Sequence, residues 1–410
     1  MVRLWVLGIA AVAAFVGLVA AHARWIVQGP RDPRFVRFMR RYNHRANAGD
    51  IIPEHGASLD RHGRPFAMAE PGSTFEKVLD ELQLVSGKPV PLTIDADLQS
   101  KAVELMEGKF GAVVVMEPAS GCIRALVSAP HVAYLNRALN GLYPPGSTFK
   151  VFMAAAALSE NVSPVFDCPA AGWRPNRSTA PIRDSEVADF ARRKKQWKGF
   201  GRIGMGEALL HSANTYFAQL GCELGTERFD AAVAAARLRD SVTVLPARTI
   251  SLSGAAGGVP EGAPKNALAP IAIGQGALQL TPLSVAMITA AVADDGLLIA
   301  PTLSAEAKPT LRARPFTIAA SRRVRKMMRE AVRRGTGNPC EIAGLGVCGK
   351  TGTAQVGAGV DHAWFTCFAP ENSPRLVVTV LVEHGGFGAK SAIPVAREIL
   401  LEARRLGYFK

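Results

Sequence analysis

The sequence is poor in charged residues, lacks any C-x-x-C pair, and contains no internal repeat and no low-complexity tract. Only 20% of its 410 residues are charged, whereas 48% are hydrophobic, so disorder is not the default state. The chain is long enough to bury one large core or two modest ones. The six cysteines have no histidine partners at ligand spacing, so we expect no metal site and no cofactor.

Acidic residues are outnumbered, with 34 Asp and Glu against 48 Lys and Arg, which gives a formal net charge of +14. Such a charge favours anionic partners: nucleic acid, anionic lipid or acidic cell-wall polymers. The densest basic run contains Arg192, Arg193, Lys194, Lys195 and Lys198. No aromatic ladder and no nucleic-acid motif surrounds it. We therefore expect no nucleic-acid partner and interpret the run as a solvated loop, with a binding patch as the alternative.

The N-terminal part contains a long uncharged run, the 18 residues from Leu4 to Ala21, preceded by Arg3. It predicts a single-pass helix in the inner (cytoplasmic) membrane, with the remainder in the periplasm or outside the cell. A signal peptide cleaved near Ala21-His22-Ala23 is the alternative. Either way the rest is exported, where disulfides persist, and Cys340 and Cys348 in "CEIAGLGVC" are a candidate disulfide.

The patterning divides the chain into three parts: a membrane anchor or signal peptide at 1–23, a short pedestal or linker at 24–89, and one domain at 90–410. In the last part, "DADLQSKAVELMEG" has helical spacing. The runs "GAVVVM" and "CIRALVS" are joined by a turn and predict two antiparallel strands.

Ala-rich and amphipathic helical segments fill the middle of this domain, and strands return at its end. "VCGKTGTAQV", "HAWFTCFAP" and "RLVVTVLVEH" predict three strands, and residues 392–407 predict a closing helix. We therefore expect an α/β (α+β) fold: an antiparallel sheet of about five strands drawn from both ends of the domain, flanked by helices and joined to a helical subdomain.

The first chemical motif is S-x-x-K, formed by Ser147 and Lys150 in "YPPGSTFK" at the start of an Ala-rich helix. Free N–H groups and the helix dipole favour an oxyanion there. Residues three apart share a helix face, so the Lys150 amine can reach the Ser147 hydroxyl, and burial lowers the pKa of a lysine until it accepts a proton. Taken alone, the pattern also fits a capping serine and a surface lysine.

The second motif is S-x-N, formed by Ser212 and Asn214 in "HSANTYF" between two predicted helices. In a tight turn their side chains can point into one cleft, where a hydroxyl relays protons and a carboxamide holds an amide. A pair of helix-capping residues is the alternative.

The third motif places Lys350, Thr351, Gly352 and Thr353 on a predicted strand, in "GKTGTA". Lysine and threonine alternate along it. We expect Gly352 to leave room for a substrate backbone that approaches as an added strand.

S-x-x-K, S-x-N and K-T-G, in this order, are the motif set of penicillin-binding proteins and class A β-lactamases. From about Val90 to the C-terminus the sequence resembles the D,D-transpeptidase domain of class B, monofunctional penicillin-binding proteins, in the serine β-lactamase/penicillin-binding protein superfamily. "LTIDADLQ", "GAVVVMEPASG", "IGQGALQLTPL" and "HAWFTCFAP" also match in the family's order. "IIPEHGASLDRHGRPFA" is similar to the start of the class B pedestal, which is shorter here than usual.

The resemblance implies a transpeptidase-like fold and a peptidoglycan D,D-transpeptidase that releases D-Ala and is inhibited by β-lactams. Ser147 would be the nucleophile, Lys150 its base, and Ser212 the proton relay to the leaving D-Ala. The remaining implied roles are substrate amide binding by Asn214, an oxyanion hole from the N–H groups of Ser147 and Thr353, and carboxylate binding on the strand of Lys350, Thr351, Gly352 and Thr353.

The implied partners are stem peptides ending in D-Ala-D-Ala, β-lactam antibiotics and a membrane-embedded glycan polymerase. A D,D-carboxypeptidase would use the same residues with water as acceptor. A class D β-lactamase shares S-T-F-K and K-T-G but carries S-x-V where this chain has S-x-N. A β-lactam-binding sensor or an inactive scaffold is an alternative from a different functional class.

Overall fold

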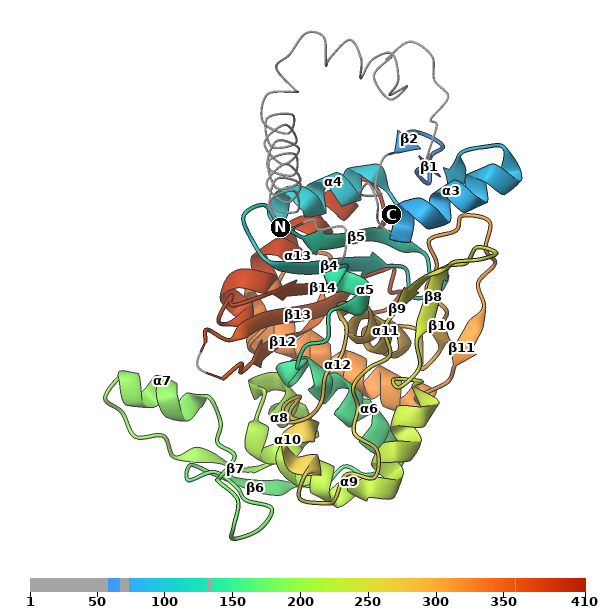
Figure 1. The fold of residues 1–410 in the computed structure, drawn as a ribbon. Helices are drawn as coiled ribbons and strands as arrows, with labels where there is room; N and C mark the ends of the chain where they lie inside the picture. Colours follow the sequence, from blue (N-terminus) through green and yellow to red (C-terminus); the bar gives the residue numbers. More distant parts are fainter. Residues whose placement is uncertain (1–57, 67–73, 131–134, 358) are drawn as a thin grey trace, which may run out of the picture.

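A computed structural model describes residues 58–66, 74–130, 135–357 and 359–410 (Figure 1). The predicted anchor at 1–23 lies outside this part of the chain. Within it, no helix is long and apolar enough to cross a membrane.

The centre of the fold is a five-stranded antiparallel sheet with the order β12-β13-β14-β4-β5. Its strands are β4 (Gly111–Met116), β5 (Ile123–Ala129), β12 (Cys348–Ala354), β13 (His362–Ala369) and β14 (Leu376–Val382). All seven residues of β14 and all eight of β13 are buried, as expected for a sheet covered on both faces. The prediction of about five strands from both ends of the domain is confirmed.

Helices cover the two faces of the sheet (Figure 1). α4 (Ala96–Leu105) and α13 (Gly388–Arg405) pack on one face, and α11 (Pro282–Ala293) and α12 (Ile318–Arg334) pack on the other. The α4 helix confirms the predicted helix there, and Asp95 caps it by accepting two backbone N–H groups. Each face has its own hydrophobic core.

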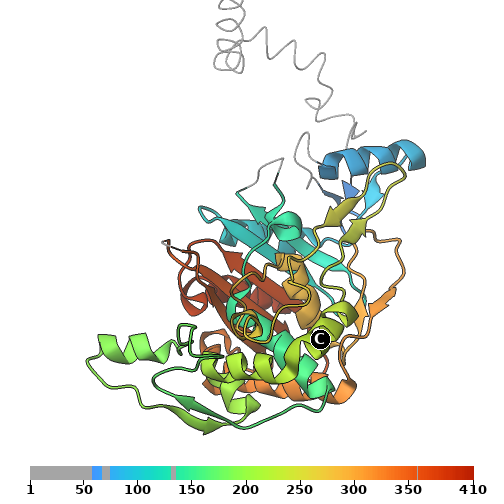
Figure 2. The same cartoon turned by 60° about the horizontal axis from the view of Figure 1, so that its bottom comes forward.

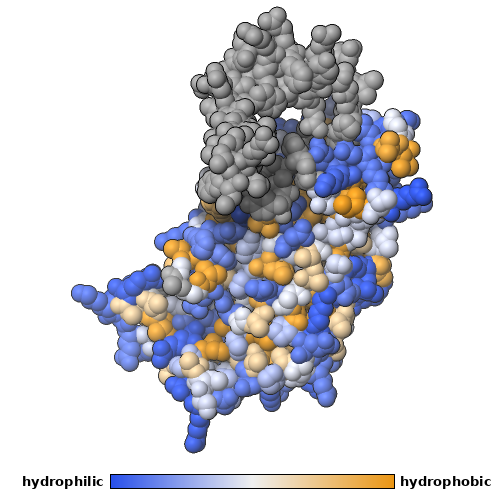
Figure 3. Space-filling view, in the orientation of Figure 1, coloured by the Kyte–Doolittle hydropathy of each residue, from blue (hydrophilic) through white to orange (hydrophobic). Residues whose placement is uncertain are grey.

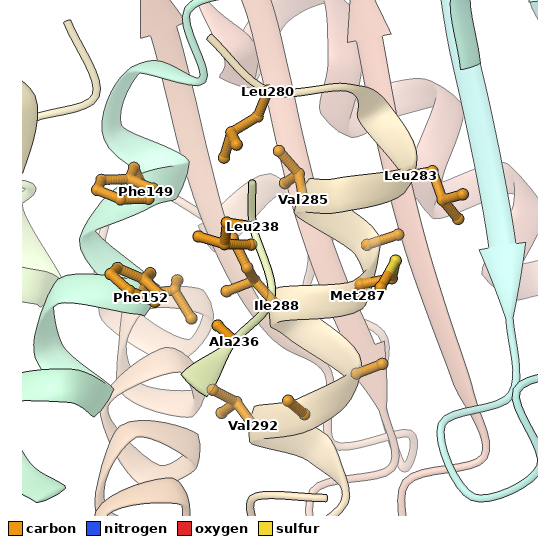
Figure 4. Packing of buried hydrophobic residues seen from close by; sticks show 14 of the residues in the cluster. Phe149, Phe152, Ala236, Leu238, Leu280, Leu283, Val285, Met287, Ile288 and Val292 are labelled. Atoms are coloured by element: carbon orange, nitrogen blue, oxygen red, sulfur yellow. The ribbon is translucent and has the colours of Figure 1, made fainter. Parts of the chain in front are cut away.

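A helical region extends the second face. It contains α6 (Lys150–Ser159), α8 (Met205–His211), α9 (Asn214–Ala235) and α10 (Leu268–Ala272). Nine of the ten residues of α6 are buried, so this helix is enclosed on all sides. Phe149 and Phe152 stack with 4.8 Å between ring centroids and face the apolar residues of α11 (Figure 4), which fixes the turn before α6.

Short elements complete the described part of the chain. One small sheet, β2-β1-β3, contains strands from both sides of the predicted domain boundary at residue 90. That boundary stays a prediction. These elements are β1 (Ser58–Leu59), β2 (Pro65–Phe66), α3 (Thr74–Ser86), β3 (Val90–Pro91), α5 (Arg137–Asn140), η3 (Gly146–Phe149), β6 (Phe166–Pro169), α7 (Glu186–Arg192), β7 (Gly199–Ile203), β8 (Val242–Leu245), β9 (Leu252–Gly254), β10 (Leu298–Ile299), β11 (Leu311–Ala313) and η4 (Asn338–Cys340).

The candidate disulfide between Cys340 and Cys348 is not formed, and both thiols are free. The reason is geometric. Cys348 lies in the core on the α11 face of the sheet, whereas Cys340 lies in the core on the α13 face, beside Cys367. Closeness in sequence therefore did not bring these two thiols together.

Candidate active site

The K-T-G motif lies on β12, which is the edge strand of the sheet. Its residues pair with β13, with Lys350 opposite Thr366 and Thr353 opposite Ala363. The other edge of β12 has no neighbouring strand within the described sheet. An extended peptide can therefore add to that edge through backbone hydrogen bonds.

Ser147 lies in the short 3-10 helix η3, which leads directly into α6. Gly146 before it has φ +52°, and its N–H donates to the Gly274 carbonyl at 2.9 Å. A Cβ on Gly274 would lie 1.8 Å from the Gly146 carbonyl oxygen, and one on Gly146 would lie 2.5 Å from the Thr353 carbonyl oxygen. Close backbone approaches that only glycine permits thus hold Ser147 beside β12.

Gly352 packs closely against neighbouring segments of the protein. A Cβ there would lie 2.8 Å from Cβ of Trp364 and 2.9 Å from Cγ2 of Thr148. The missing side chain therefore makes room for the Ser147 turn and for β13, and its expected role toward a substrate stays a prediction. The Trp364 indole also donates to the Pro144 carbonyl at 3.1 Å, which ties the same turn to β13.

The S-x-N motif occupies the junction between α8 and α9. Ser212 ends α8 in the left-handed conformation, with φ 60° and ψ 36°, and Asn214 is the first residue of α9. The Asn214 amide donates to the Arg183 carbonyl at 2.9 Å, so its oxygen faces the opposite way.

Lys150 is fully buried and points at this junction. Its Nζ donates to the Ser212 carbonyl oxygen at 2.6 Å and to Oδ1 of Asn214 at 2.6 Å, and Oγ of Ser212 lies 3.3 Å away. Burial lowers the pKa of Lys150 to about 7, and the nearby carboxylates of Asp184 and Glu186 act in the opposite direction. At neutral pH a large fraction of this amine is therefore uncharged.

Lys350 reaches the same hydroxyl from the other side. Its Nζ donates to Oγ of Ser212 at 2.8 Å and to the Thr351 carbonyl at 3.0 Å. Burial, and then the charge of Lys150, hold the pKa of Lys350 well below its usual value. The Ser212 hydroxyl thus lies between two buried lysines, and all three motifs meet there.

The hydroxyls of Ser147 and Thr353 have no hydrogen-bond partner among the described residues, and both side chains are half-buried. The expected bond between Ser147 and Lys150 is absent from this part of the chain, because the short bonds of Lys150 go to Ser212 and Asn214. The Thr351 hydroxyl donates to the Thr336 hydroxyl at 2.9 Å. Thr353 is consequently the hydroxyl of the K-T-G strand that has no partner among the described residues.

Two contributors were missed by sequence reasoning. Asp184 is buried and accepts the Thr215 N–H at 3.0 Å and the Thr215 hydroxyl at 2.7 Å, so it caps α9 from a distant segment. Thr336 follows α12 and had no motif to mark it. Gly274, by contrast, belongs to "IGQGALQLTPL", so a signal for it was present. Among the described residues, no three His, Cys, Asp or Glu side chains group as metal ligands would.

Known proteins share this sequence pattern. The family model of the penicillin binding protein transpeptidase domain matches residues 111–401. A peptidoglycan D,D-transpeptidase MrdA of Haemophilus influenzae is 31% identical over 385 residues, which cover 77% of this chain and 56% of that protein. The chain thus spans little more than half of that relative's length.

Two solved structures share the fold. The D,D-transpeptidase domain of a peptidoglycan glycosyltransferase from Eggerthella lenta has a TM-score of 0.73 and 26% identity, covering 86% of this chain and 98% of that one. Penicillin-binding protein A from M. tuberculosis, as a penicillin G acyl-enzyme complex, has a TM-score of 0.66 and 26% identity, covering 79% of this chain and 84% of that one.

Proposed function

The chain belongs to the penicillin-binding protein transpeptidase family, and we propose that it is a peptidoglycan D,D-transpeptidase acting through an acyl-enzyme on Ser147. The observation that carries this proposal is the convergence of Lys150 and Lys350 on the Ser212 hydroxyl, beside the turn that holds Ser147. A purely structural role would not require two buried lysines to which no carboxylate of the described residues is hydrogen-bonded.

In the acylation step, Oγ of Ser147 attacks the penultimate D-Ala carbonyl and its proton passes to the neutral amine of Lys150. The amide bond then breaks. The leaving D-Ala nitrogen takes its proton from the Ser212 hydroxyl, which is refilled from Lys150 at 3.3 Å. The products are an ester on Ser147 and free D-Ala.

The oxyanion of the tetrahedral intermediate would lie between the backbone N–H groups of Ser147 and Thr353. The Ser147 N–H lies in the first turn of η3, where helix N–H groups lack intrahelical acceptors. Gly146 brings that turn against the Thr353 backbone. Such a donor contributes on the order of 3 kcal/mol to the transition state.

The substrate would bind along β12. Asn214 would hold its amide through the carboxamide, and the terminal carboxylate would face Lys350 and the Thr353 hydroxyl. The Thr351 hydroxyl donates to the Thr336 hydroxyl, so we propose that Thr351 contributes to substrate binding through this pair of hydroxyls. Gly352 supports the strand by admitting the Ser147 turn.

The second half of the reaction needs an acceptor. An amine from a neighbouring stem peptide would attack the ester, give its proton to Lys150 and restore Ser147. Transpeptidation is preferred over the carboxypeptidase alternative because the H. influenzae relative is named a D,D-transpeptidase. β-Lactams would acylate the same serine, as the acyl-enzyme complex of the M. tuberculosis protein suggests.

We also propose the cellular setting. The uncharged run from Leu4 to Ala21 would anchor the chain in the inner membrane, with residues 90–410 as the catalytic domain in the periplasm or outside the cell. A membrane-embedded glycan polymerase would supply the strands, because the motifs found here join peptides and do not polymerise glycan.

Mass spectrometry of the full chain after exposure to benzylpenicillin tests the proposal. We expect a stable adduct on Ser147 that is lost in Ser147→Ala. Addition of a D-Ala-D-Ala donor and an acceptor amine should release D-Ala and form the cross-linked peptide. Rapid conversion of benzylpenicillin to penicilloate would instead support a β-lactamase, and the absence of any adduct would refute an active site at Ser147.

A further inference from the structure

β6, α7 and β7 form an arm that projects at the left in Figures 1 and 2, away from the helical layers. The densest basic run of the sequence lies at the end of α7 and just beyond it. We call it the basic arm end: Arg192, Arg193, Lys194, Lys195 and Lys198, all of them exposed. In the space-filling view the projecting arm is largely hydrophilic (Figure 3).

The arm is attached to the active site at its base. The Arg183 carbonyl accepts the Asn214 amide at 2.9 Å, and Asp184 caps α9 through Thr215. The arm therefore starts at the S-x-N motif, and its position depends on the same residues that position Asn214.

A row of rings also fixes the basic arm end. Phe190 contacts Trp197 at 5.0 Å between centroids, Trp197 contacts Phe200 at 4.9 Å, and Phe200 stacks on His211 at 5.2 Å. His211 is the residue before Ser212. The basic side chains are thus presented from a packed segment, which lowers the entropy lost when they bind a ligand.

The C-terminal end of α7 lies near the residue that precedes α13. The Arg192 guanidinium lies 5.9 Å from the centroid of the Phe387 ring, and Nζ of Lys390 lies 6.0 Å from it. Phe387 is 45% exposed, and Gly388 after it is so close to β12 that a Cβ would lie 2.6 Å from the Gly352 carbonyl oxygen. Arg192 of the basic arm end therefore lies near the segment that packs against β12 at the K-T-G motif.

Four of the five charges of this surface have no ion-pair partner within the described chain. Arg193, Lys194, Lys195 and Lys198 make no ion pair with any described residue. By contrast, five partly buried arginines have carboxylate partners: Arg124, Arg137, Arg239, Arg325 and Arg329. Exposed cations without a carboxylate partner attract anionic ligands and bind carboxylates.

We propose that the basic arm end binds carboxylate groups of the donor stem peptide, upstream of the D-Ala-D-Ala pair that reacts. This inference rests on the proposed function. The donor's terminal carboxylate is held on β12, and the rest of an acidic peptide leaving that edge passes the arm. The surface thus makes the enzyme selective for donors that carry free upstream carboxylates over their amides.

Fluorescence anisotropy with the full chain tests this directly. Two labelled peptides ending in D-Ala-D-Ala are compared, one with a free side-chain carboxylate upstream and one with its amide. In Lys194→Gln/Lys195→Gln we expect the Kd of the carboxylate peptide to rise roughly three- to tenfold at low salt, with little change for the amide. In about 1 M salt the difference should disappear.

Lys308→Gln/Arg314→Gln is the matched control, because it removes two exposed charges from the β10–β11 region on the opposite side of the view in Figure 1. Equal weakening of both peptides, or the same effect in the control, would overturn the proposed surface. A benzylpenicillin adduct on the wild-type chain reports separately on the proposed function. Its absence together with carboxylate-dependent binding would overturn the function and leave the surface standing.

Discussion

We expect the rate at which a β-lactam acylates Ser147 to follow the protonation of Lys150. Burial moves the pKa of this lysine from its ordinary value of 10.5 to about 7, which corresponds to about 5 kcal/mol in favour of the neutral amine. Only the neutral amine can accept the serine proton. The rate should therefore fall roughly tenfold for each pH unit below 7 and level off above pH 8.

Stopped-flow acylation by a fluorescent penicillin, from about pH 5.5 to about pH 9, measures this profile. Thermal unfolding at each pH separates the loss of the base from the loss of the fold. Lys150→Arg keeps a positive charge at every pH, so it should lower the acylation rate by roughly 10²- to 10⁴-fold. A flat profile, or a midpoint near the ordinary lysine pKa, would refute Lys150 as the base.

Three further outcomes can be measured. Since the pKa of Lys150 is lower in the folded chain than in the unfolded one, the free energy of unfolding should rise between about pH 7 and pH 10, and Lys150→Met should flatten that rise in denaturant titrations. Asp184→Asn removes the carboxylate that caps α9 and should cost about 1–2 kcal/mol of unfolding free energy, measured in urea; an unchanged midpoint would contradict the cap. Gly274→Ala should slow acylation and cost at least about 2 kcal/mol more than Gly276→Ala, because both glycines have positive φ but only the first meets the Gly146 carbonyl; equal costs would contradict that contact.

The sheet could be predicted from the sequence because its strands have a strong local signal. β4 was predicted with the bounds that it has, and β12, β13 and β14 fell within the predicted runs. Apolar β-branched residues on both faces of a strand, bounded by turn residues, are enough to predict that strand. The three motifs were found for a related reason, since each is a contiguous pattern.

The contacts between distant segments could not be predicted in the same way. No local pattern shows that Asp184 caps a helix 31 residues away, or that Thr336 meets Thr351. The thiols of Cys340 and Cys348 are close in sequence, yet the sheet separates them. Which face a residue joins depends on strand register, and a shift of one residue reverses it.

The proximity of Lys150 and Lys350 explains why Lys150 readily passes on the proton that it accepts from Ser147. Both amines are fully buried, and within the described part of the chain no carboxylate is hydrogen-bonded to either of them. Burial lowers both pKa values, and a charge on Lys150 lowers that of Lys350 further. A proton arriving on Lys150 thus enters an environment that disfavours it, and the hydroxyl of Ser212 offers the exit toward the leaving amine. Burial of these two amines destabilises the fold at neutral pH. The same burial keeps Lys150 available as the base for acylation and favours release of the proton that it accepts.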